Sequence, residues 1–541
     1  MRVLLPLPVL LPLAAAAVSI LVGRSRRWQR IVSISTLTAV VGLAVAILVE
    51  VDRDGIVATQ AGDWGAPLGI TLVADRFSAV MLVVASVVLL AVVIYAVGQP
   101  GAERNHVGFQ SVYLVLAAGV AAAFLTGDLF NLFVAIEMML TASYVLITLG
   151  GRLDQVRAGM TYVVISLVAS ILFLAALAFT YSATGTVNLA DLSGRIAELP
   201  DGVQGGLAGL FLVVFGIKAG LFPLYFWLPD SYPTAPSPVT AIFAGLLTKV
   251  GVYAIIRTQT LLFPGVLPTW LVMAVAGATM VVGVLGAIAQ DDVKRLLSFH
   301  IISHIGYMLM GLGLATVAGL AGAVFYTVHH ILVKTTLFLT GGLIEHHGGS
   351  SRLSRLGDMV RGAPLLAVLF LVPALSLAGI PPMSGFVAKL SLVDAAAEER
   401  QWAMVVVSVA VSLLTLFALM KIWMGAFWAP VTEGEDGRPP APDARGGPRS
   451  RWGGPALMVV PTVVLALGTV VLGVLSGPLY DLSTRAATDL VDPEPYVTAV
   501  LGDGPTDLAD DDGDAGGGGP AQDGPVGGGG PAQDGPAGGG G

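Results

Sequence analysis

Apolar runs separated by short polar segments dominate the chain from residue 3 to residue 478. Most runs are about 20 residues long, the length that an α-helix needs to cross the hydrocarbon core of a bilayer. Transmembrane β-strands would instead alternate over segments of about 10 residues. The pattern therefore predicts an all-α polytopic membrane protein. We expect about 14 transmembrane helices, at residues 3–22, 31–49, 72–97, 110–126, 129–149, 158–182, 206–227, 236–258, 266–289, 296–315, 321–343, 364–399, 403–428 and 454–478.

The seventh and twelfth of these helices are expected to be broken, because glycine and proline interrupt them. The sequence AGLFP at 219–223 matches AGIPP at 378–382. The two breaks lie five segments apart, an odd number, so the two halves of the chain would be inverted relative to each other. Interrupted helices at matching positions of two halves are typical of a transport site.

Arginine is concentrated in alternate loops. Arg24, Arg26, Arg27 and Arg30 follow the first predicted helix, so this helix is not expected to be a cleaved signal peptide. By the positive-inside rule these arginines assign their loop to the cytoplasm. The alternation continues along the chain and supports an even number of helices. We therefore expect both termini on the extracytoplasmic side.

The composition supports a membrane protein and excludes thiol chemistry. Of the 541 residues, 55% are hydrophobic and only 12% are charged. There is no cysteine, which excludes disulfides, thiolate metal sites, iron–sulfur clusters and cysteine catalysis. No cofactor is expected.

The lysines, unlike the arginines, fall inside the apolar segments. Five of the six do so (Lys218, Lys249, Lys334, Lys389 and Lys421), and we expect only Lys294 in a loop. A charge at the bilayer centre costs about 2.5–3.5 kcal/mol, so such residues usually mark an ion path. Lysine, unlike arginine, can release its proton when desolvated. The distribution predicts a proton relay, whereas snorkelling near a helix end explains Lys421 equally well.

Glu137 is the one carboxylate placed deep in an apolar segment, and Thr141 and Tyr144 share its helix face. Lys218 is available as a counter-charge, which predicts a buried pair in which each partner senses the protonation of the other. A purely structural, hydrogen-bonding glutamate is the alternative interpretation.

Histidines accompany the lysines of two later segments. His300, His304 and Tyr307 share one helix face, and His330 shares another with Lys334. Histidine both gives and takes protons near neutral pH, which suits a relay. Ligation of a haem by two histidines is disfavoured for adjacent His329 and His330, because they point about 100° apart on a helix. His329 could equally hydrogen-bond to a neighbouring helix.

Six stretches resemble the proton-translocating antiporter family, and the likeness covers about residues 1–480. They are GDWGAPLGITLVADRFSAVML (62–82), DLFNLFVAIEMMLTASYVLI (128–147), KAGLFPLYFWLPDSYPTAPSPVTAIFAGLLTKVGVYAIIR (218–257), DDVKRLLSFHIISHIGYM (291–308), HHILVKTTLFLTGG (329–342) and AGIPPMSGFVAKL (378–390). That family comprises antiporter-like membrane subunits of respiratory complex I, of membrane-bound hydrogenases and of multisubunit Mrp-type cation/proton antiporters.

The resemblance implies a fourteen-helix fold with two inverted five-helix repeats and a charged, water-lined axis at mid-membrane. The positions that it assigns to this axis are Glu137, Lys218, Lys249, His330, Lys334 and Lys389. Lysine at 389 is most similar to the D-type branch of the Mrp antiporter subunits, since the complex I branch carries glutamate there. Glu137 argues against a further branch that has lysine at that position, and no long lateral helix is expected after the fourteenth span.

We expect five parts in the chain. Helices 1–3 occupy residues 1–109, a first repeat (helices 4–8) residues 110–260, and a second, inverted repeat (helices 9–13) residues 261–428. A cytoplasmic loop and helix 14 follow at 429–480. The acidic, Gly- and Pro-rich tail at 481–541 has little to bury and is expected to be disordered.

The sequence thus predicts a multi-pass cell-membrane subunit of a Na⁺ (or other monovalent cation)/proton antiporter rather than an enzyme. Its expected partners are other membrane subunits, the transported ions and the lipid bilayer, with no nucleic acid. The alternatives are a proton-pumping subunit of NADH:quinone oxidoreductase (complex I) or of a membrane-bound hydrogenase, and a non-pumping scaffold subunit.

Overall fold

The computed structural model describes residues 2–23, 25–99, 108–430 and 454–502. The fold below lies within Met1–Leu501, one of two units of the chain. Arg24, most of the predicted loop at 429–453 and the tail from residue 503 lie outside the described residues.

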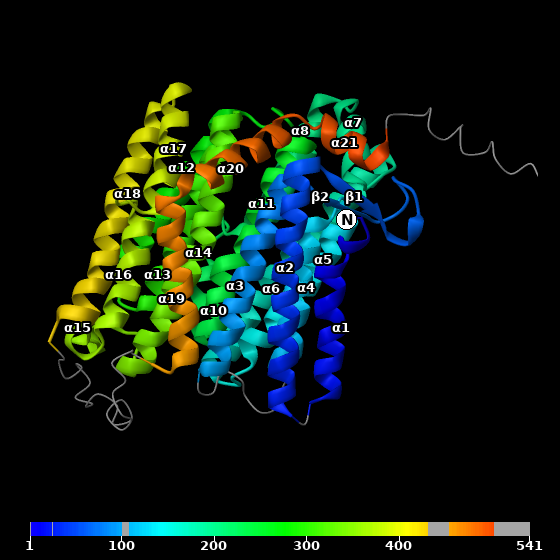
Figure 1. Ribbon diagram of the computed structural model, residues 1–541. Helices are drawn as coiled ribbons and strands as arrows, with labels where there is room; N and C mark the ends of the chain where they lie inside the picture. The colour runs from blue at the N-terminus through cyan, green and yellow to red at the C-terminus, as the bar shows by residue number, and fades with distance from the viewer. Residues whose placement is uncertain (1, 24, 100–107, 431–453, 503–541) are drawn as a thin grey trace, which may run out of the picture. The chain divides into compact units, whose positions relative to one another are not determined.

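The fourteen predicted segments are helical. Eleven of the described helices are long and apolar enough to cross a membrane, and α1, α4 and α16 are shorter apolar helices. The prediction of an all-α polytopic membrane protein is therefore confirmed (Figure 1). The segments are α1 (Leu7–Leu21), α2 (Arg26–Asp54), α3 (Arg76–Gly98), α4 (Phe109–Leu125), α5 (Leu129–Thr148), α6 (Leu153–Thr184), α8 (Asp201–Ala219), α10 (Ser237–Ile242) with α11 (Thr248–Leu261), α12 (Thr269–Ile288), α13 (Val293–Gly313), α14 (Val317–Gly348), α16 (Pro364–Ala378) with α17 (Ser384–Glu398), α18 (Trp402–Ile422) and α19 (Ala456–Val474).

Shorter elements connect these helices. They are the helices α7 (Leu189–Ala197), α9 (Trp227–Ser231) and α15 (Met359–Gly362), the π-helices η4 (Phe243–Leu247) and η6 (Trp423–Trp428), and the 3₁₀ turns η1 (Arg2–Leu4), η2 (Ala61–Asp63), η3 (Tyr232–Thr234) and η5 (Leu353–Arg355).

Both predicted helix breaks are present. α8 ends at Ala219 and α16 at Ala378, and the next residue in each case is a glycine in the left-handed conformation, Gly220 (φ +83°) and Gly379 (φ +89°). Glycine is the residue that adopts this C-terminal conformation without strain. The inverted relation between the two halves remains a prediction.

A β-hairpin precedes α3 and was not predicted. Strand β1 (Val57–Gln60) pairs antiparallel with β2 (Thr71–Ala74), with Val57 opposite Ala74. The expected helix at 72–97 therefore begins later, at Arg76. Asp75 caps it, since its side chain accepts from the backbone N–H of Ser78. Only Asp75 and Arg76 separate the apolar residues of β2 from those of α3, so hydrophobicity alone did not reveal the boundary.

The prediction of disorder from residue 481 is wrong for residues 481–501. These residues belong to α20 (Ser476–Val491) and α21 (Glu494–Leu501), which run across the helix ends at the top of Figure 1. α20 contacts α14 and α3. Its buried residues, Ser483, Ala486, Ala487 and Leu490, recur at helical spacing. Small and polar side chains on this face made it resemble a solvated tail.

α14 forms the centre of the fold. It contacts α3, α10, α13, α16, α17, α19 and α20. Every residue from Gly319 to Ile344 is buried, including histidines, a lysine and several threonines. Such polar side chains are tolerated at membrane depth where protein surrounds them.

Candidate functional site

Glu137 of α5 and Lys218 of α8 form the predicted ion pair, but only the lysine is buried, so the expectation of a fully buried pair is wrong. The Lys218 Nζ lies 3.8 Å from the Glu137 Oε1. Ser170 of α6 bridges them, because its hydroxyl donates to Glu137 and accepts from Nζ at 3.0 Å. Nζ also donates to the Ser166 carbonyl at 3.2 Å. Sequence reasoning missed Ser170, although Ser166 and Ser170 stand one helical turn apart in the sixth segment.

The two partners of this pair differ in exposure. The Lys218 side chain is 7% exposed and that of Glu137 is 28% exposed. Val134 and Thr141, one turn to either side of Glu137, are also exposed. The carboxylate therefore lies at the lateral surface of the chain, on the outer face of α5.

Lys249 lies on α11 directly after the π-helix η4. Its Nζ donates to the Ala244 carbonyl at 2.6 Å and to the Thr248 Oγ1 at 3.1 Å, and the residue is fully buried. A π-helix shifts the backbone hydrogen-bond pattern by one residue, and such segments are frequent at functional sites.

Gly251 allows α11 and α8 to touch close to both lysines. A Cβ atom at this position would meet the backbone N of Ala219 at 2.7 Å, which is too close for any side chain. Gly251 lies two residues after Lys249, and Ala219 directly follows Lys218. The contact therefore brings the Lys218 end of α8 against α11.

Histidine and tyrosine rings of α13 and α14 form one buried cluster. His304 lies 5.9 Å from His300 and 5.3 Å from His330, measured between ring centroids, and it hydrogen-bonds to the Tyr326 hydroxyl. Among the described residues, neither ring nitrogen of His300 or His330 has a hydrogen-bond partner. Buried polar groups are usually paired, so these unpaired nitrogens are candidates for proton transfer.

Lys334, one turn after His330, donates to the Leu297 carbonyl of α13 at 3.1 Å. Lys389 of α17 donates to the Ala378 carbonyl at 3.1 Å, an acceptor that the break between α16 and α17 sets free. Its Nζ also lies 5.2 Å from the centroid of the Tyr307 ring. The break in the twelfth helix thus places Lys389 next to the histidine–tyrosine cluster.

His329 donates to or accepts from the Ser384 hydroxyl of α17 at 2.8 Å. The interpretation of His329 as a residue that hydrogen-bonds to a neighbouring helix is therefore confirmed.

Counter-charges divide the buried lysines of the predicted relay into two groups. Lys218 has Glu137, whereas Lys249, Lys334 and Lys389 have no carboxylate at ion-pair distance within the described part of the chain. Each of these three rests on a backbone carbonyl instead. An ammonium group without a counter-charge is costly to bury, so these lysines are candidates for proton exchange.

The two remaining lysines lie at helix ends. Lys421 pairs with Asp291 at 2.7 Å and is only half-buried, as expected of a snorkelling side chain. The placement of Lys294 in a loop is wrong: it occupies the first turn of α13, is buried, and contacts Glu345 at 2.5 Å. The polar run DDVKR resembled a loop because Asp292 caps the helix there.

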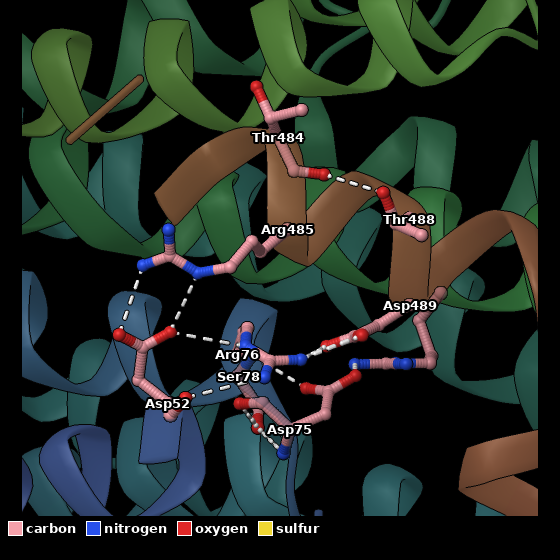
Figure 2. Close-up of polar contacts among 9 residues, drawn as sticks. Asp52, Asp75, Arg76, Ser78, Thr484, Arg485, Thr488 and Asp489 are labelled. Atoms are coloured by element: carbon pink, nitrogen blue, oxygen red, sulfur yellow. Dashed lines mark hydrogen bonds and ion pairs between the residues drawn. The ribbon is translucent and has the colours of Figure 1, made fainter. Parts of the chain in front are cut away.

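A second charged cluster, missed in the sequence, joins α20 to α2 and α3. Figure 2 shows Arg76 between Asp52 and Asp489, with Arg485 also bonded to Asp52. Arg76 donates to both oxygens of Asp489 at 2.9 Å. Burial raises the pKa of the Asp489 carboxyl, and the adjacent Arg76 opposes this effect.

Beside this cluster, Arg257 of α11 pairs with Asp75, the N-cap of α3, at 2.5 Å. Both side chains are buried, and the guanidinium lies 5.2–5.7 Å from the ring centroids of Phe77, Tyr253 and Tyr496. The ring of Tyr496 belongs to α21, so the terminal helices cover this pair.

Residues 126–415 match the family described as "NADH:quinone oxidoreductase/Mrp antiporter, TM". The chain is 44% identical over 505 residues to the D subunit of the Na⁺/H⁺ antiporter of Alkalihalophilus pseudofirmus, covering 93% of this chain and 100% of that protein. It resembles a chain of the Mrp complex from Dietzia sp. DQ12-45-1b, with a TM-score of 0.85 and 37% identity over 93% of this chain and 100% of the other. A chain of respiratory complex I from Thermus thermophilus is less similar, with a TM-score of 0.69 and 25% identity over 87% and 99%.

Proposed function

Because the chain belongs to the NADH:quinone oxidoreductase/Mrp antiporter family, we propose that it is the D-type subunit of a multisubunit antiporter. In this proposal the complex exchanges cytoplasmic Na⁺, or another monovalent cation, for external protons. The chain itself forms no covalent bond with its substrates and conducts protons through the membrane interior. The greater likeness to an Mrp complex than to complex I favours antiport over redox-driven pumping.

One observation carries the proposal: three buried lysines donate to backbone carbonyls, and two of them lie near interruptions of a helix. Lys249 follows the π-helix η4, and Lys389 uses a carbonyl at the end of α16. Lys334 lies between them in sequence, one turn from His330. Interrupted helices at membrane depth supply polar backbone groups to ion paths.

In the proposed path Lys389 is the terminal site that exchanges protons on the external side. The histidine cluster connects Lys389 to the central groups, His330, Lys334 and Lys249. Neutral histidine can accept a proton at one ring nitrogen and donate from the other, which permits transfer along the cluster. The two halves, residues 110–260 and 261–428, would each contribute one broken helix.

The Glu137–Lys218 pair is the proposed point of coupling to a neighbouring subunit. A carboxylate at the lateral surface would face lipid in an isolated chain, and such exposure is costly. We infer that another membrane subunit covers this face of α5 and responds to the charge of Glu137. The proposed location is the cell membrane, with both termini on the extracytoplasmic side.

The test is Na⁺-dependent proton flux in everted vesicles from a host that lacks its own antiporters, with the chain expressed beside its partner subunits. Lys249→Ala should abolish flux while the complex assembles at a normal level. Full flux in that variant would remove Lys249 from the path and leave the proposal without its central relay.

A further inference from the structure

Lys294 and Glu345 form an ion pair between two buried central helices. Lys294 is the second residue of α13, and Glu345 lies in the last turn of α14. Nζ and Oε2 are 2.5 Å apart. The lysine side chain is 7% exposed and the glutamate side chain 41% exposed. The carboxylate thus stands at the surface, with the ammonium group behind it.

Helix electrostatics disfavour this orientation at both ends. The N-terminus of a helix carries a partial positive charge, which opposes a lysine, and the C-terminus carries a partial negative charge, which opposes a glutamate. An exchanged pair, with glutamate on α13 and lysine on α14, would tie the same helices together and agree with both dipoles. Anchoring alone therefore does not explain the native orientation.

The need to orient the chain in the membrane does not explain the position of Lys294 either. Positive charges that set topology act in short loops and near helix ends. The neighbouring Arg295 can serve that purpose, because its pair with Asp230 at 2.8 Å is exposed on both sides. Lys294 is buried and so adds little to the charge that the membrane surface experiences.

A polar cavity of about 450 Å³ opens at the pair. Its lining includes Gln155, Ser237, Gly342 and Glu345 as well as Lys294. The Ser237 hydroxyl, at the start of α10, donates to the Glu345 Oε2 at 3.2 Å. The buried Gln155 Oε1 has no hydrogen-bond partner among the described residues.

The pair also lies next to the relay. Leu297, one turn after Lys294, provides the carbonyl that holds the Lys334 Nζ. Glu345 is eleven residues beyond Lys334 on α14, or about 16 Å along the helix. The threonines between them, Thr335, Thr336 and Thr340, are buried on the same helix. The cavity, the pair and Lys334 therefore follow one another along the α13–α14 contact.

We propose that Lys294 and Glu345 form the gate through which the relay exchanges protons with the cavity, on the face that the basic loops assign to the cytoplasm. A proton that reaches Glu345 neutralises the carboxylate and releases Lys294, which opens the path to Ser237. When the proton passes to cavity water, the carboxylate is restored and the pair closes again. This proposal rests on the proposed function.

The decisive variant exchanges the charges, Lys294→Glu with Glu345→Lys. It keeps the ion pair and should unfold thermally at or above the native temperature, since both helix dipoles then favour it. It should nevertheless reduce Na⁺-dependent proton flux in everted vesicles at least tenfold, because a lysine then faces the cavity. If the exchanged variant assembles normally and has native flux, the gate is refuted, and the pair only anchors the two helices.

Two controls accompany this variant. The matched exchange Arg295→Asp with Asp230→Arg, at the exposed pair beside it, should leave flux within about twofold of native. Lys249→Ala, measured in parallel, separates the two proposals. Full flux in Lys249→Ala contradicts the proposed function, whereas loss of flux there with native flux in the exchanged variant contradicts only the gate.

A labelling experiment tests the gate without measuring flux and without using the exchanged variant. The chain has no cysteine, so Ser237→Cys introduces a single thiol. Ser237 borders the cavity and contacts the closed pair, yet the residue is only 1% exposed. A membrane-impermeant maleimide should label this thiol at least fivefold faster when Glu345→Gln is added, because the pair is then broken. Equal labelling rates with and without Glu345→Gln would refute the gate.

Discussion

The Lys389 ammonium group lies over the ring of Tyr307, 5.2 Å from its centroid, and donates to the Ala378 carbonyl. Neither group carries a full charge, so together they favour the ammonium form less than a carboxylate would. A stronger partner, such as a carboxylate, would favour the ammonium state and oppose release of the proton. The contact therefore suits a site that must titrate.

Lys389→Arg should transport as poorly as Lys389→Ala. Arginine retains the charge but does not release its proton in proteins. We expect both variants to assemble and to lose roughly 90% or more of Na⁺-dependent proton flux, as removal of an essential proton-transfer group does. Vesicle assays normalised to protein level test this. Near-native flux in the arginine variant would show that only the positive charge matters.

Ser170→Ala should weaken coupling at the Glu137–Lys218 pair. The serine hydroxyl contacts both partners, which are themselves 3.8 Å apart. We expect Glu137→Ala and Lys218→Ala to be inactive, and Glu137→Asp to keep part of the activity. Flux in Ser170→Ala should fall by about tenfold, between these variants and native. Ser182→Ala, on the exposed end of the same helix, is the matched control and should remain active. Unchanged flux in Ser170→Ala would mean that the ion pair needs no bridge.

Asp75→Asn should destabilise the assembled protein strongly. It leaves Arg257 buried without a counter-charge, and breaking a buried pair costs about 3–5 kcal/mol. Arg485→Gln removes an exposed partner of Asp52 and should cost about 0–1 kcal/mol. Thermal unfolding of the purified complex distinguishes the two. Equal shifts in Tm for both variants would contradict the assigned roles.

Truncation after residue 502 should leave membrane level and salt tolerance normal. Residues 503–541 lie outside the described residues, and their Gly- and Pro-rich composition offers little apolar surface to bury. Truncation after Leu475 should instead lower the membrane level several-fold, because it also removes α20 and α21 from α14, α3 and Arg257. Growth at high Na⁺ and immunoblots of membranes provide the measurements. Loss of function in the shorter deletion would reveal a binding role for the tail.

The residues that were predictable carry a strong local signal. Lys218 stands two residues before Gly220, and Lys389 seven residues after Pro382. Each lysine contrasts with its apolar surroundings, and both the breaks and the charges are visible in the sequence. Ser170 has no such signal, because serine is ordinary in membrane helices and its role depends on where α6 meets α5 and α8. Lys294 was misplaced because a helix cap and a loop share the same polar residues. The face of α20 was missed because alanine and serine bury well only against a partner that the sequence does not reveal.

The enclosure of α13 and α14 has a consequence for biogenesis. They are the two least apolar of the eleven candidate spans, and both are mostly buried. A translocon releases helices into lipid according to their apolar character, and these two offer little of it. Their stable insertion therefore depends on the helices that surround them, several of which are synthesised afterwards. The ribosome must therefore complete α16 to α20 before α14 is fully surrounded by the helices that bury it.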